Sequence, residues 1–185
     1  KEYPTEIAEV ASMAMELFSM DKWNVFFDSP EELKRAKEQQ LERVITIFPW
    51  IATIDKFQHW IYENPNHTEE ERSAQWMIIA EEFSSPLIDF SGLEEYRRYG
   101  WQRQLHLYEV PFYYIEYGIA QLGAIAVWRN YKQNKHKAVE DYKNALKLGY
   151  TKSIPEMYKA AGIEFNFTAA YVKELMEFLN KEIEN

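Results

Sequence analysis

Helix start and stop signals recur along almost the whole chain, and this pattern limits its possible folds more than any other feature. Residues 29–32 read Ser-Pro-Glu-Glu, which combines a capping side chain, a proline suited to the first helical turn and two acids at the positive end of the helix dipole. Residues 68–71 form a capping box, and the Asn-Pro-Asn at 64–66 stops the preceding helix. No run alternates apolar and polar residues cleanly enough to predict a strand. We therefore expect an all-α fold, a multi-helix array.

The spacing of apolar residues and the capping signals also predict where the helices lie. We expect them at about residues 4–20, 30–62, 69–83, 92–105, 111–132, 135–148, 154–161 and 168–183. Pro49 is a candidate kink inside the second helix. Ser153 and Thr168 read as caps, and Gly149 and Gly162 read as stops. No repeat, low-complexity tract or Gly/Ser-rich linker divides the sequence, so residues 1–185 are predicted to form a single helical region.

The composition excludes several classes of protein. Apolar residues make up 46% of the chain, too many for a disordered protein, and the absence of cysteine excludes disulfide scaffolds and Cys-based metal sites. The formal charge of −9 argues against a nucleic-acid partner, which requires a basic surface. The longest apolar run, residues 119–128, is far shorter than the ~20 residues of a membrane span. We expect a soluble, cytoplasmic protein and, because residue 1 is Lys rather than Met, a piece of a longer polypeptide.

Histidine-based metal motifs are missing from the chain. None of the four histidines belongs to an HExxH motif, and none follows a Glu at the spacing that di-iron bundles use. Asp55, His59 and Glu63 follow one another at four-residue steps and so share a helix face. That face could bind a metal, but a solvated polar stripe explains the pattern more simply.

Two acids near the start of the chain share a helix face with uncharged residues. Glu9, Ser12, Met13 and Glu16 fall on this face at steps of three, one and three. The simpler interpretation is a pair of surface acids on an acidic protein. The functional alternative is a carboxylate metal ligand, with a second carboxylate that orients its neighbours.

A tyrosine-rich segment follows the third histidine. Tyr114 and Tyr117 are three residues apart, at the start of the helix that Pro111 is expected to open, so their hydroxyls would share a helix face. Two fixed O–H donors, with His106 nearby, could stabilise an oxyanion that develops during acyl transfer. The alternative is an aromatic core stripe whose hydroxyls find ordinary partners.

Taken together, these stretches resemble the C-terminal part of an oligoendopeptidase F-type zinc metallopeptidase, a family related to the thimet-type oligopeptidases. Residues 4–16 resemble the segment that donates the third zinc ligand in that family. The resemblance implies that Glu9 binds Zn²⁺ and that Glu16 is a neighbouring carboxylate that orients the ligands. Residues 148–162 resemble the family's C-terminal helices.

Residues 103–118 resemble the family's substrate-clamping segment. In that segment a His and a Tyr donate hydrogen bonds to the scissile carbonyl, and the resemblance assigns these catalytic roles to His106 and Tyr117, with Tyr114 as a helper. The length of the loop before the tyrosines varies in the family, so neighbouring tyrosines can take the same place. Tyr108 and Tyr113 are therefore further candidates for substrate binding.

The family's HExxH motif, which carries two zinc-binding histidines and the general-base Glu, is absent here. The resemblance places it upstream of Lys1, in a missing N-terminal part of the same enzyme. It implies short peptides as substrates, one zinc ligand in this chain, and a chain that alone binds zinc weakly and cleaves nothing. The alternative is a non-catalytic helical interaction domain that binds a peptide or a partner helix through an aromatic groove. Neither interpretation requires a membrane or a nucleic acid.

Overall fold

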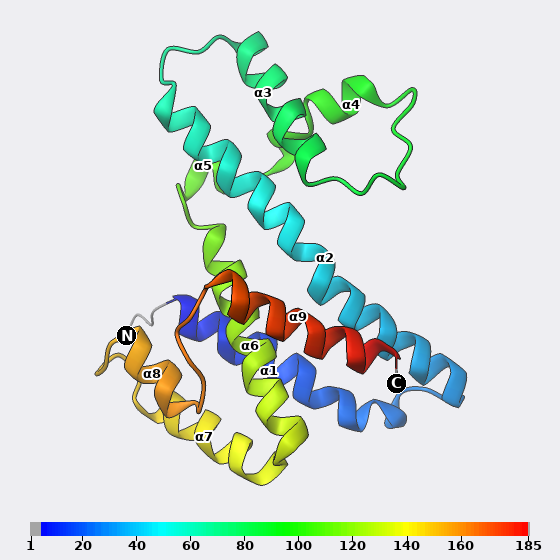
Figure 1. Ribbon diagram of the computed structural model, residues 1–185, viewed down its shortest axis with the longest axis vertical. Helices are drawn as coiled ribbons and strands as arrows, with labels where there is room; N and C mark the ends of the chain where they lie inside the picture. The colour runs from blue at the N-terminus through cyan, green and yellow to red at the C-terminus, as the bar shows by residue number, and fades with distance from the viewer. Residues whose placement is uncertain (1–4, 185) are drawn as a thin grey trace. The chain divides into compact units, whose positions relative to one another are not determined.

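A computed structural model describes residues 5–184, and every regular element in that range is a helix (Figure 1). The predicted all-α fold is therefore confirmed. The predicted helix start at Pro4 lies outside the described residues. The elements are α1 (Thr5–Ser19), η1 (Met20–Val25), α2 (Pro30–Glu63), α3 (Glu69–Glu82), α4 (Glu94–Arg98), η2 (Gly100–Arg103), α5 (His106–Glu109), α6 (Ile115–Gln133), α7 (Lys135–Lys147), α8 (Ile154–Ala160) and α9 (Ala169–Glu184).

Most helix boundaries lie where the capping signals predict them. The amide of Thr68 donates to Glu71 Oε2 at 2.8 Å, and the amide of Glu71 donates back to Thr68 Oγ1 at 3.2 Å, which completes the capping box of α3. At the start of α2, Ser29 Oγ accepts from the amide of Glu32 at 3.1 Å. Gly162, predicted to stop α8, has a φ of 74°, a conformation that glycine adopts without steric cost.

The helix predicted at residues 92–105 is wrong as a single element. It is two short pieces, α4 and η2, separated at Tyr99. The indole of Trp76 donates to the Arg97 carbonyl at 2.8 Å, and in a continuous helix that carbonyl would accept from the amide of Trp101. Trp101 is instead turned into the core, where it is 5% exposed.

The helix predicted to begin at Pro111 begins four residues later, at Ile115. Phe112 has a φ of 58°, which no right-handed helix contains, and its amide donates to Gln58 Oε1 at 2.9 Å. Pro111 therefore belongs to a turn between α5 and α6. In α2, by contrast, the helix continues through Pro49.

The chain forms two compact units. The part up to Ile45 packs with the part from Glu116 onward to make the first unit, and Thr46–Ile115 make the second. Helix α2 contributes to both, since it spans Pro30–Glu63. Within the described residues, no helix is both long enough and apolar enough to cross a bilayer.

Helix α6 is the centre of the first unit, and it contains the longest apolar run of the sequence. Every residue from Ala120 to Trp128 is buried, as expected for a helix packed on all sides. A Cβ atom added at Gly123 would lie 2.8 Å from Val10 Cγ2 of α1 and 3.0 Å from the Tyr158 hydroxyl of α8. Only a glycine therefore lets these helices approach α6 so closely.

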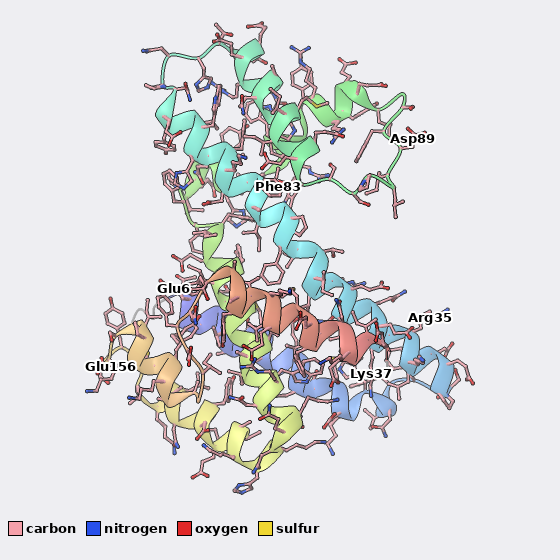
Figure 2. The ribbon with its side chains drawn as sticks, viewed as in Figure 1. Glu6, Arg35, Lys37, Phe83, Asp89 and Glu156 are labelled. Atoms are coloured by element: carbon pink, nitrogen blue, oxygen red, sulfur yellow. The ribbon has the colours of Figure 1, made fainter. Side chains whose placement is uncertain are left out.

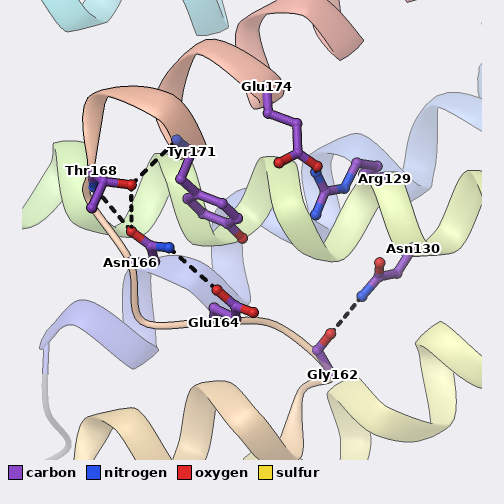
Figure 3. A network of polar contacts seen from close by, with 8 residues as sticks. All are labelled: Arg129, Asn130, Gly162, Glu164, Asn166, Thr168, Tyr171 and Glu174. Carbon is purple, nitrogen blue, oxygen red and sulfur yellow. Dashed lines mark hydrogen bonds and ion pairs between the residues drawn. The ribbon is translucent and has the colours of Figure 1, made fainter.

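Polar contacts cap the N-terminal end of α9 and join this helix to α6 (Figure 3). Asn166 Oδ1 accepts from the Thr168 hydroxyl at 2.9 Å, and Thr168 Oγ1 accepts from the amide of Tyr171 at 3.4 Å. Arg129 of α6 forms an ion pair with Glu174 of α9 at 2.6 Å. The predicted cap at Thr168 is confirmed, and this ion pair joins the two helices.

The second unit has an aromatic core. Ile54 and Phe57 of α2, Trp76 and Ile79 of α3, and Trp101 form one buried cluster. The Phe57 and Trp76 rings meet edge to face with centroids 5.1 Å apart, a favoured aromatic geometry. Part of the high aromatic content is therefore structural.

Candidate functional site

Glu9 and Glu16 lie on one face of α1 in the first unit, as predicted. Glu9 is half-buried, and its Oε2 accepts from the Ser12 hydroxyl at 3.3 Å. Glu16 is exposed, and its Oε2 accepts from Gln40 Nε2 of α2 at 3.2 Å. The Glu9 carboxylate thus has a hydrogen-bonding neighbour one turn along the helix.

One carboxylate does not make a zinc site. Catalytic zinc normally takes three protein ligands and a water. Among residues 5–184, no three His, Cys, Asp or Glu side chains are grouped to hold a metal ion. Asp55 Oδ2 and His59 Nε2 are 3.6 Å apart on α2, but no third ligand joins them, so the metal interpretation of that stripe has no support. The described residues therefore do not form a complete zinc site by themselves.

His106, at the start of α5, is surrounded by two predicted tyrosines and two residues that the sequence analysis gave no role. Its ring stacks on Tyr113 with centroids 5.9 Å apart and meets the Tyr114 ring edge to face at 5.0 Å. Its Nδ1 is 2.6 Å from Gln104 Nε2, and Gln104 Oε1 accepts from the Trp50 indole at 3.3 Å. We call these five residues the His106 cluster. All five belong to the second unit.

Tyr114 is a hydrogen-bond donor at neutral pH. Burial raises the pKa of its phenol above the usual value, against smaller opposing effects of Trp50 and Arg103. A protonated phenol beside an imidazole supplies the type of donor that stabilises a developing oxyanion.

The other two predicted tyrosines are Tyr108 and Tyr117. Tyr108 is exposed and stacks on Trp101, with ring centroids 6.1 Å apart, so it is attached to the aromatic core. Tyr117 is half-buried on α6 and belongs to the first unit, which also carries Glu9. The expectation that Tyr114 and Tyr117 share a helix is wrong, because α6 begins at Ile115 and Tyr114 precedes it.

A pair of acids that the sequence analysis did not identify joins the first turns of α1 and α6. Glu6 projects from α1 (Figure 2), and its carboxyl is the hydrogen-bonding neighbour of Glu116. Glu116 Oε2 is buried and has no hydrogen-bond partner among the described residues. Burial, and then the nearby Glu6 charge, raise the pKa of Glu116 from 4.5 to about 7. Two ionised carboxylates can only accept hydrogen bonds, so a proton on Glu116 supplies the hydrogen for its bond to Glu6.

This pair predicts a pH-dependent stability that Glu116→Gln removes. Between pH 4.5 and about 7 folded Glu116 keeps a proton that the unfolded chain releases, so the free energy of unfolding falls as pH rises through that interval. Above pH 7 both states are ionised, and the cost of the buried charge remains. We expect Glu116→Gln to be more stable than the parent at pH 8 by about 1 kcal/mol, allowing for solvent exposure. Urea unfolding at a series of pH values measures the difference.

Glu140→Gln is the matched control, because Glu140 is exposed on α7. This control should leave the difference between variant and parent nearly independent of pH. A Glu116→Gln variant whose stability follows the parent at every pH would show that the Glu116 proton does not matter.

The second unit also contains an apolar cavity of about 480 Å³. Trp50, Trp76, Phe83 and Phe90 line it, with Arg97 among the polar contributors. Trp50 is shared between this cavity and the His106 cluster. The cavity is large enough for an apolar side chain of a peptide.

The residues that could not be identified from the sequence are those that contact a predicted site residue or one another, rather than the predicted site residues themselves. Gln104 stands two residues before His106, inside a segment singled out for its family resemblance, but its spacing carries no specific signal. Trp50 is 54 residues away from Gln104, and Glu6 is far from Glu116 in sequence. No local pattern links such pairs.

Comparison with known proteins extends over nearly the whole chain. A model of peptidase family M3 matches residues 1–177. An oligoendopeptidase F homolog from Borreliella burgdorferi is 24% identical over 161 residues, which are 85% of this chain and 27% of that protein.

Solved structures of similar proteins agree with this match. A structure of PZ peptidase A with an inhibitor superposes with a TM-score of 0.90 at 31% identity, covering 98% of this chain and 32% of its own. A structure from Bacillus anthracis strain Ames, named as an oligoendopeptidase F, gives a TM-score of 0.76 at 27% identity, with 97% and 28% coverage. The chain thus spans about a third or less of the length of these relatives.

Proposed function

This chain belongs to peptidase family M3, and we therefore propose that it forms part of a zinc-dependent endopeptidase that hydrolyses short peptides. The observation that carries the proposal is the family match over residues 1–177, a range that includes Glu9, His106 and Tyr117. We propose that residues 1–185 are one portion of the catalytic domain and that the remaining portion carries the HExxH motif.

The proposed contribution to the metal is Glu9. Its half-buried carboxylate, oriented by Ser12, would be one protein ligand, and Glu16 would help to orient the ligands. The other ligands would come from the portion with the HExxH motif, since the described residues offer no complete set. When bound, zinc supplies an activated water and polarises the peptide carbonyl.

The proposed contribution to the reaction is a set of hydrogen-bond donors. His106 and Tyr117 would donate to the carbonyl oxygen as it gains negative charge, with Tyr114 beside His106 as a third donor. Tyr113, which stacks on His106, and Tyr108 would contact the peptide. His106, Tyr114 and Tyr117 would each act by donating a hydrogen bond.

The isolated chain is expected to take up no stoichiometric zinc and to cleave no peptide, because it lacks two of the three ligands and the general base. Joined to the HExxH portion, the same residues should bind one zinc and hydrolyse short peptides. Competition with a chromophoric chelator measures the zinc, and fluorescence-quenched peptides measure the cleavage. Stoichiometric zinc and peptide hydrolysis by the isolated chain would contradict the proposal.

Three variants of the joined polypeptide test the proposed ligand and its neighbour. Glu9→Ala should lose the zinc, whereas Glu140→Ala, at an exposed position, should keep it. Glu16→Gln should weaken zinc binding by roughly 10- to 100-fold, the usual cost of losing a group that orients a ligand. A Glu9→Ala polypeptide that retained its zinc would move the ligand to another residue.

The alternative proposal, a non-catalytic domain that binds a peptide or helix, has one observation in its favour. This is the apolar cavity lined by Trp50, Trp76, Phe83 and Phe90. A helix or peptide with an apolar anchor would fill such a cavity without zinc. Tight binding of apolar peptides by a metal-free polypeptide that cleaves none of them would favour this alternative.

A further inference from the structure

Gln104 connects an indole to the imidazole of the His106 cluster. It is half-buried, and its side-chain amide lies between Trp50 of α2 and His106 of α5. The two contacts are Trp50 Nε1 to Gln104 Oε1 at 3.3 Å and Gln104 Nε2 to His106 Nδ1 at 2.6 Å. Each end of the amide therefore has its own partner.

The chemistry of the indole decides which way the amide points. An indole nitrogen has a hydrogen and no acceptor lone pair, so the atom that faces it must accept. In Gln104 only Oε1 accepts, and the reversed amide would place two donors against each other. The NH₂ group of Gln104 is thus held toward His106.

The orientation of the amide then decides the tautomer of the imidazole. An amide NH₂ only donates, so His106 Nδ1 must accept and carries no hydrogen. In the neutral ring the hydrogen is consequently on Nε2. The ring plane is also held, since Tyr113 stacks on it and the Tyr114 edge meets it.

Tyr114 takes part in the same arrangement. The Trp50 indole also interacts with the Tyr114 hydroxyl, and Arg103 lies over the Trp50 ring at 5.1 Å. The Trp50 N–H therefore faces two acceptors, Gln104 Oε1 and the Tyr114 hydroxyl oxygen. The indole nitrogen can only donate, whereas the imidazole can carry its hydrogen on either ring nitrogen.

We infer that Gln104 is a positioning residue that keeps His106 in the Nε2–H tautomer, so that Nε2 is the nitrogen that donates to the carbonyl oxygen of a peptide substrate. This inference rests on the catalytic role proposed for His106. The tautomer assignment is argued from the contacts of Trp50, Gln104 and His106 and not from that role.

The test is ¹⁵N NMR of the chain labelled at histidine, recorded above pH 8.5, where an ordinary imidazole is neutral. We expect a pyrrole-type shift for His106 Nε2 and a pyridine-type shift for Nδ1. Gln104→Glu replaces the donating NH₂ by an accepting oxygen, so the hydrogen should move to Nδ1 and the two shift types should exchange. A parent chain protonated on Nδ1, or a Gln104→Glu chain with unchanged shifts, would overturn the inference.

Two further variants keep the test decisive. Gln102→Glu adds the same charge two residues away at an exposed position and should leave both shifts in place. An exchange in this control too would make the effect one of charge alone and would overturn the inference.

If Gln104→Glu loses its helical circular dichroism, Trp50→Phe replaces it. Without the indole N–H the amide can turn, and the two shifts should approach each other, whereas unchanged shifts would overturn the inference.

Activity separates this inference from the proposed function. In the zinc-loaded polypeptide, Gln104→Glu should lower kcat about 100-fold with KM little changed, because the donor acts mainly in the transition state. If the tautomer exchanges in Gln104→Glu but kcat does not fall, His106 has no part in the reaction and the tautomer assignment still holds. A lowered kcat without a tautomer exchange would overturn the assignment.

Discussion

Tyr117→Phe is expected to lower kcat by roughly 100- to 1000-fold in the zinc-loaded polypeptide, with KM within a few-fold of the parent value. The substitution removes one oxygen atom and leaves the ring, which is half-buried on α6. A donor that binds the carbonyl oxygen only as it becomes negative contributes to turnover and little to substrate affinity. Steady-state kinetics on a quenched peptide measures both constants.

The matched control is Tyr150→Phe. Tyr150 is 72% exposed, so the loss of its hydroxyl should leave kcat and KM unchanged. Zinc content must be measured in each variant, because loss of the metal would also lower kcat. If Tyr117→Phe kept its zinc and its full turnover, Tyr117 would have no part in the reaction.

Gly123→Val is expected to lower the free energy of unfolding by about 3 kcal/mol, at the upper end of the cost of overpacking. Even the first added atom would lie 2.8 Å from Val10 Cγ2 and 3.0 Å from the Tyr158 hydroxyl. Val10 and Tyr158 are 5% and 1% exposed, so neither can move aside into solvent. The better helix propensity of Val over Gly, a few tenths of a kcal/mol, does not offset this clash.

Val10→Ala provides the second half of a double-mutant cycle. Alone it should destabilise the chain, because it removes buried methyl groups. Combined with Gly123→Val it should restore part of the loss, with a coupling energy on the order of 1 kcal/mol between residues in contact. Ala8→Val, at an exposed position of α1, measures the difference in helix propensity between Ala and Val. The same difference, with opposite sign, applies to Val10→Ala. Strictly additive losses would show that α1 and α6 do not meet at Gly123.

The elements that could be predicted from the sequence depend on neighbours within one turn. The box between Thr68 and Glu71 and the cap at Ser29 involve residues three apart, and both form as predicted. The family resemblance similarly depends on short segments. It identified the tyrosines and Glu9 by type and order, and their individual roles remain predictions.

The wrong helix boundaries occur where the side chain of a distant residue forms a hydrogen bond with a backbone group. A Trp76 indole on the Arg97 carbonyl ends the helix predicted at 92–105, and Gln58 takes the amide of Phe112. The proton of Glu116 and the orientation of Gln104 likewise depend on partners far along the chain. Sequence periodicity contains no information on such pairs, so a helix boundary or a tautomer set by them could not be derived from it.

The order of the segments has a consequence for how the protein is made. Helix α1 is synthesised before its core partners, since the Tyr142 hydroxyl donates to the Ala11 carbonyl across 131 residues and Tyr158 of α8 and Val10 of α1 both approach Gly123. The second unit is one uninterrupted stretch, Thr46–Ile115, so its core is complete on the ribosome before α6 emerges. Glu9 thus lies on a helix that is translated well before the helices that pack against it. A chain that ended at Ile115 would therefore contain every residue of the second unit but none of the later helices that pack on α1.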